Sequence, residues 1–165
     1  MWDCFYFFFG ENNVLINSNV ISLIEQAFIL FAVAFAEELF FRGLLLRELI
    51  FGYCLKPMLA AIIVSLLFGA LHILNIFSYA TMSYAIVQGF CAFAIGFDLA
   101  AIYCRFRSVV PCILVHAVIN ITSIGLDGKG TKLAINNVEA IIFFSIAILY
   151  LIHGYKSLKA RSFST

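Results

Sequence analysis

The chain has 165 residues, of which 64% are hydrophobic, 12% charged and 16% aromatic, and its mean hydropathy is +1.08. A soluble domain is typically about half apolar and about a quarter charged, and one of this size could not bury so much apolar surface. The formal net charge of +1, with basic residues in short clusters, argues against a nucleic-acid partner. The composition predicts one integral membrane domain over residues 1–165.

Residues 1–19 are predicted to form an amino-terminal anchor and not a cleavable signal. The stretch CFYFFFG is short, lacks basic residues before it and has no small-residue cleavage site after it. Aromatic side chains favour the membrane–water interface, so we interpret this stretch as an interfacial or partly inserted anchor.

Five apolar segments follow, each near the ~20 residues that a helix needs to cross the hydrocarbon layer. The first is longer than one crossing requires, so one of its ends should project or tilt. Glycines and charges interrupt the pattern in residues 125–132, GLDGKGTK, which predicts a loop. The fold class predicted is an all-α, polytopic transmembrane bundle of about five helices. The predicted spans are residues 20–50, 58–74, 79–104, 109–125 and 138–155.

Basic residues are concentrated in alternate connections of this predicted bundle. By the positive-inside rule these connections are cytoplasmic, which predicts an external amino terminus and a basic cytoplasmic tail over residues 156–165. The expected location is the cytoplasmic membrane of a prokaryote. The basic residues are Arg47 and Lys56, then Arg105 and Arg107, then Lys156, Lys159 and Arg161.

Small residues and cysteines within the spans are assigned to packing. Gly89, Ala92, Gly96 and Ala100 recur at three- and four-residue steps, a spacing that lets two membrane helices approach closely. The five cysteines form no CxxC pair and most lie in apolar runs, so we expect buried thiols and not disulfides or metal ligands.

Several polar side chains lie too deep in the spans to reach an interface. Each requires a partner or a function, because an uncompensated polar or charged group is costly in a bilayer. Asp98 could pair with Arg105 or with a group on another helix, and His153 is expected at the interface. The remaining members are Glu37, Glu38, Arg42, His72, His116 and Asn120.

The stretch FAEELFFRG, residues 35–43, contains two carboxylates and one arginine. Glu38 precedes Arg42 by four residues, the favourable orientation for a helical ion pair, so these two charges can neutralise each other. Glu37 lies about 100° around the helix from Glu38, so Arg42 cannot serve both equally. Glu37 is therefore the carboxylate predicted to have a function.

The other polar residues are predicted to face Glu37. His72 lies at a matching depth, about 20 Å from the connection between the first two spans, and Phe68 precedes it by one turn and could pack on its ring. His116 and Asn120 are four residues apart and share one stripe of the fourth span. Three helices thus offer a carboxylate, two imidazoles and an amide.

This set of groups predicts peptide-bond hydrolysis with water as the nucleophile. Removing a carboxylate from water favours its protonated form, which suits a general base that returns its proton to a leaving amine. One histidine could orient the water, and the other, with the asparagine, could donate hydrogen bonds to an oxyanion. A serine mechanism fits less well, because Ser65 is about two turns from His72 and no G-x-S-x-G turn is present.

A zinc site is the alternative that these residues leave open. Two histidines and a glutamate are a known catalytic zinc set, so Glu37, His72 and His116 would be the ligands if a metal were used. No H-E-x-x-H motif is present, and histidines on separate helices can act without a metal. We therefore predict that no cofactor is required.

The motifs EELFFR, FGALH and HAVIN resemble the EExxxR, FxxxH and HxxxN motifs of the CAAX protease and bacteriocin-processing (Abi) family of intramembrane endopeptidases. The resemblance covers roughly residues 31–123. It implies that Glu37 and His72 activate water and that His116 and Asn120 form the oxyanion site. It also implies that Glu38 and Arg42 support and orient the motif helix.

The resemblance predicts an intramembrane endopeptidase that processes a membrane-associated or lipidated peptide or protein near its carboxyl terminus, or a bacteriocin-like peptide. The expected partners are this substrate and the lipid bilayer, with a membrane protein or a second copy of the chain as a further possibility. The alternative is a non-catalytic protein, such as a bacteriocin-immunity factor or a small carrier, that uses the buried charges for binding.

Overall fold

The computed structural model describes residues 20–77, 80–122 and 136–162. The predicted anchor, 1–19, and the predicted loop, 125–132, lie outside these ranges. Every regular element within them is helical, which confirms the predicted all-α bundle. The elements are α2 (Val20–Glu38), η1 (Leu39–Leu46), α3 (Arg47–Phe51), α4 (Pro57–Ile73), η2 (Leu74–Phe77), α5 (Met82–Phe106), α6 (Val110–Thr122) and α7 (Asn137–Ser162).

The first predicted span is one helical path with a change of type in its middle. Between α2 and α3, the eight residues of η1 form a π-helix. A π-helix is wider than an α-helix, occurs mostly as short interruptions and is frequent at functional sites. The sequence indicated a continuous α-helix here, so η1 corrects that expectation at the position of the EELFFR motif.

Local chemistry explains where the other helices begin and end. Pro57 occupies the first turn of α4, where its missing N–H costs nothing. The Thr81 hydroxyl accepts a hydrogen bond from the Tyr84 N–H and caps α5. At the other end of α5, Arg107 has φ 55°, in the left-handed region, and its N–H donates to the Tyr103 carbonyl.

Three helices in the described part of the chain are long and apolar enough to cross a membrane: Pro57–Phe77, Met82–Phe106 and Asn137–Ala160. The described part of the fourth predicted span, 109–125, is the 13-residue apolar helix α6, about 20 Å long at ~1.5 Å per residue. The fifth extends beyond residue 155, so Lys156 and Lys159 of the predicted tail lie within α7.

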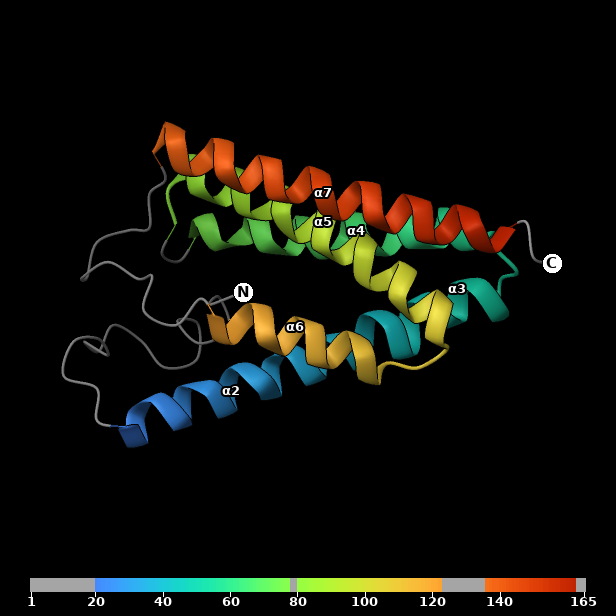
Figure 1. The fold of residues 1–165 in the computed structure, drawn as a ribbon, viewed down its shortest axis with the longest axis horizontal. Helices are drawn as coiled ribbons and strands as arrows, with labels where there is room; N and C mark the ends of the chain where they lie inside the picture. Colours follow the sequence, from blue (N-terminus) through green and yellow to red (C-terminus); the bar gives the residue numbers. More distant parts are fainter. Residues whose placement is uncertain (1–19, 78–79, 123–135, 163–165) are drawn as a thin grey trace.

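The helices form two groups that α5 and η1 connect. Helices α4, α5 and α7 pack together, and α2 packs against α6 (Figure 1). Small residues allow the closest of these approaches: a Cβ on Gly69 of α4 would lie 2.6 Å from the Gly89 carbonyl oxygen of α5. The small-residue stripe predicted for packing is therefore at a helix–helix contact.

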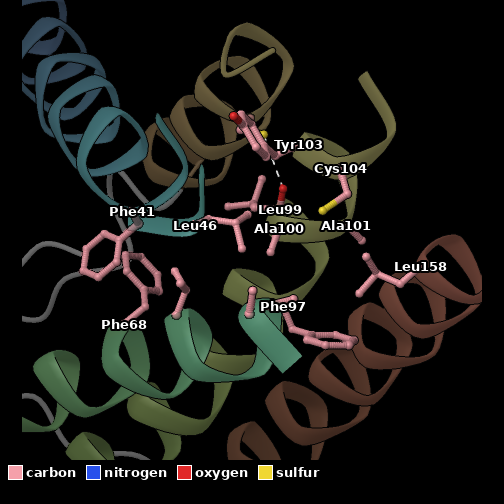
Figure 2. Packing of buried hydrophobic residues seen from close by; sticks show 14 of the residues in the cluster. Phe41, Leu46, Phe68, Phe97, Leu99, Ala100, Ala101, Tyr103, Cys104 and Leu158 are labelled. Carbon is pink, nitrogen blue, oxygen red and sulfur yellow. Dashed lines mark hydrogen bonds between the residues drawn. The ribbon is translucent and has the colours of Figure 1, made fainter. Parts of the chain in front are cut away.

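Buried apolar side chains from both groups meet in one core. Figure 2 shows Phe41 of η1 beside Phe68 of α4, with Phe97 of α5 and Leu158 of α7 in the same cluster. The Phe41 and Phe68 rings meet edge to face, with centroids 4.9 Å apart. This core fixes η1 against α4 directly beside the polar residues of the motifs.

The cysteines and Asp98 can now be placed. None of the four cysteines in the described ranges is in a disulfide. Cys104 and Cys112 are buried, as predicted, whereas Cys54 is exposed, which corrects the expectation of a buried thiol at that position. Asp98 of α5 pairs with a side chain of another helix, because its Oδ1 lies 2.5 Å from Nδ1 of His153 on α7. The alternative partner Arg105 is exposed in the last turn of α5.

Candidate active site

The site is organised around a buried ion pair within one helix. Arg42 Nη1 donates to Glu38 Oε1 at 2.6 Å, and both side chains are completely buried. Arg42 Nη2 also donates to the Gly96 carbonyl of α5 at 2.9 Å. The predicted ion pair is confirmed, and the second contact ties η1 to α5. A Cβ on Gly96 would lie 3.3 Å from Arg42 Nη2, so a small residue suits this position.

His116 of α6 lies between the two carboxylates of the EELFFR motif. Its Nδ1 is 2.7 Å from Glu38 Oε1, and its Nε2 is 3.5 Å from Glu37 Oε2. An ionised carboxylate only accepts hydrogen bonds, so the Nδ1 proton is donated to Glu38. This orientation directs Nε2 to Glu37, and one imidazole therefore joins both carboxylates.

The two carboxylates differ in burial. The Glu38 side chain has no exposed surface, whereas 20% of the Glu37 side-chain surface is exposed. Glu38 is also committed to Arg42 and His116. Glu37 is therefore the carboxylate with exposed surface, and its Oε2 atom, which faces His116, is itself buried.

The Phe68 ring contacts His72, His116 and Arg42. Its centroid is 4.5 Å from that of His72 and 5.9 Å from that of His116. The Arg42 guanidinium carbon lies 5.0 Å from the same centroid, within the range of a cation–π contact. The prediction that Phe68 packs against the His72 ring is confirmed, and the same ring also meets the His116 ring edge to face.

His72 and Asn120 are each held by a backbone carbonyl. His72 Nδ1 donates to the Phe68 carbonyl at 2.7 Å, so in the neutral ring the lone pair is on Nε2. Asn120 Nδ2 donates to the Leu30 carbonyl of α2 at 3.4 Å. Both side chains are buried. Direct contacts thus join Glu37, Glu38, Arg42 and His116, Phe68 links His72 to them, and Asn120 is fixed to α2.

Sequence reasoning missed two parts of this arrangement. The Gly96 carbonyl carries no side-chain signal, although the small residue allowing its approach to Arg42 was recognised as a packing residue. The contact of Glu38 with His116 joins residues 78 positions apart. Periodicity reports contacts within one helix, so no local pattern could have indicated this pairing.

The zinc site that the sequence left open would use Glu37, His72 and His116. Among the residues that the structure describes, no three His, Cys, Asp or Glu side chains are grouped as a metal ion requires. Both histidines donate from Nδ1, His116 to Glu38 and His72 to a carbonyl, as metal-ligating histidines also do, so these hydrogen bonds do not distinguish the two alternatives. We derive no step through a metal.

The fold and the buried cluster define a class: a helical integral membrane protein whose apolar interior holds two carboxylates, two imidazoles, a guanidinium and an amide. The family model for Type II CAAX prenyl endopeptidase Rce1-like matches residues 19–122, which include every residue of the cluster. The chain belongs to this family, and membership implies protease activity. No curated protein and no solved structure matches the chain.

Proposed function

We propose that this chain is a glutamate-dependent intramembrane endopeptidase in which Glu37 is the general base. The observation that carries the proposal is the placement of His116 between a fully buried Glu38 and a partly exposed Glu37. Glu38 and Arg42 fix the imidazole, and the imidazole faces the carboxylate that has exposed surface. A general base must lie within hydrogen-bond reach of the proton that it takes from water, directly or through one water molecule.

In the proposed reaction Glu37 takes a proton from water as the water oxygen attacks the scissile carbonyl carbon. The His72 Nε2 lone pair accepts the second hydrogen of this water and orients it. When the tetrahedral intermediate collapses, the C–N bond breaks and Glu37 returns its proton to the leaving nitrogen. General-base catalysis of this kind contributes typically about 10²–10⁴-fold.

The proposed oxyanion donors are Asn120 and His116. The Asn120 amide nitrogen donates to the Leu30 carbonyl, and a carboxamide N–H is the kind of donor that stabilises a developing oxyanion. His116 can donate from Nε2 when its ring carries both protons. Its positive charge would then complete a neutral cluster with Arg42, Glu37 and Glu38.

The proposed substrate is a prenylated CAAX peptide at the carboxyl terminus of a membrane-associated protein, as the family description indicates. The test is cleavage of a farnesylated CAAX peptide by the full chain reconstituted in liposomes, with the unprenylated peptide alongside and product masses as readout. We expect the farnesylated peptide to be cleaved, and Glu25→Gln, a change at an exposed carboxylate of α2, to match the wild type. Binding of the peptide without any cleavage would instead support the alternative of a non-catalytic binding protein.

We also propose that no metal is required. Washing the reconstituted protein with a chelator is expected to leave the cleavage rate unchanged, because the proposed base and donors are all side chains of the chain itself. Metal removal is verified by elemental analysis of the washed sample. Loss of activity that added zinc restores would overturn this part of the proposal.

We further propose that the basic end of the bundle faces the cytoplasm of a prokaryotic cell. Cys54 lies in the connection between α3 and α4 at this end, is exposed and is free. A membrane-impermeant maleimide is expected to label it in inside-out vesicles but not in intact spheroplasts, with Cys54→Ser as the control. The reverse pattern would invert the proposed orientation.

A further inference from the structure

A hollow of about 610 Å³ lies between η1, α3 and the carboxyl end of α5. Arg47 and Phe51 line it from one side and Tyr103, Arg107 and Ser108 from the other. These elements meet at the end of the bundle where α7 also ends (Figure 1). The hollow is open over much of its extent, so it is a surface depression and not an enclosed cavity.

The lining is complementary to an anion. Arg47 and Arg107 are both exposed, and none of the eight lining residues is acidic. The Arg107 guanidinium carbon lies 4.8 Å from the centroid of the Phe51 ring, which places this charge at the hollow. Ser108 accepts a hydrogen bond from the Val110 N–H at 3.2 Å, so the positive end of the 13-residue helix α6 is at the same place.

The lining is also amphipathic along its length. Leu39, Arg47 and Phe51 line the hollow from the helical path of η1 and α3, so its surface changes along this path from the apolar Leu39 to the charged Arg47. Exposed Leu44 and Phe106 extend the apolar surface at this end of the bundle. A soluble anion would contact the guanidinium groups alone, whereas a phospholipid would contact both the guanidinium groups and the apolar side chains.

We propose that this hollow binds the phosphate headgroup of an anionic phospholipid, with its acyl chains along the apolar side. Basic pockets between membrane helices bind such headgroups. The occupant would contact η1 at Leu39, directly after Glu38. The proposal is independent of the proposed peptidase function, because it requires the hollow and its charges but no chemistry.

Native mass spectrometry of the full chain in detergent micelles tests this site, with phosphatidylglycerol as probe and phosphatidylcholine for comparison. Arg47→Gln and Arg107→Asn remove one charge each, and asparagine tolerates the left-handed backbone at position 107. We expect phosphatidylglycerol binding to weaken about fivefold for each charge and about 25-fold for both, with phosphatidylcholine unaffected. The matched control is Arg105→Gln, which removes an exposed charge two residues from Arg107 outside the hollow.

Several results would overturn the proposal. An equal loss for Arg105→Gln would show a diffuse surface attraction. Displacement of the lipid by inorganic phosphate would show a soluble-anion site, and displacement by a peptide with a free carboxyl terminus would show a substrate site. A double Arg47→Lys and Arg107→Lys variant that stays helical by circular dichroism is expected to keep most of the binding, and loss of binding by that variant would contradict a charge-based site.

Discussion

Glu37→Gln is expected to lower kcat for cleavage of a farnesylated CAAX peptide by about 10²–10⁴-fold. The substitution nearly preserves shape and removes the only basic lone pairs of the proposed general base. The Glu37 side chain is 20% exposed, and the carboxylate that pairs with Arg42 is that of Glu38. The fold of the Glu37→Gln variant should therefore persist. Reconstituted protein, assayed at saturating substrate, gives the rate, and circular dichroism gives the helical content.

The matched control for this substitution is Glu25→Gln. Glu25 is an exposed carboxylate on the same helix, α2, so this variant makes the same chemical change far from the cluster. It is expected to keep the wild-type rate. Full activity of Glu37→Gln, or an equal loss in both variants, would show that Glu37 is not the base.

Arg42→Met is expected to destabilise the protein by about 3–5 kcal/mol, because it removes the guanidinium partner of the fully buried Glu38. The guanidinium also donates to the Gly96 carbonyl, so the contact between η1 and α5 loses its polar link. Methionine retains much of the side-chain volume and separates the loss of charge from the loss of packing. Thermal unfolding in detergent measures the change.

Two further variants make this stability prediction specific. Arg105→Met removes an exposed arginine from the end of α5 and is expected to change stability by less than about 0.5 kcal/mol. Adding Glu38→Gln to Arg42→Met removes the stranded charge and should restore part of the lost stability. If Arg42→Met were as stable as Arg105→Met, the ion pair would contribute nothing measurable to the fold.

The sequence was sufficient for features that depend on local pattern. Apolar length placed the described helices within a few residues, except that α7 continues to Ser162, past the predicted end at residue 155. The four-residue step from Glu38 to Arg42 indicated the ion pair that the structure contains. The angular offset of the neighbouring Glu37 separated the two carboxylates. The structure adds a difference in burial, because Glu38 is fully enclosed and Glu37 is not.

Features that depend on contacts between helices were beyond the sequence. The contact of Glu38 with His116 arises because α2 packs against α6, and helical periodicity carries no information on which helices are neighbours. Asp98 could not be assigned to His153 for the same reason. The π-helical turn of η1 was missed because its residues, LFFRGLLL, are equally compatible with an α-helix.

The central claim is that Glu37 and His116 act as one unit, and a double-mutant cycle on kcat/KM tests it most directly. Glu37→Gln, His116→Ala and the double variant are measured on the farnesylated peptide under the same conditions. Residues that act as a unit are grossly non-additive, so the double variant is predicted to lose about as much activity as the more damaging single variant. Losses that multiply would show that the two residues act independently, and would contradict the account.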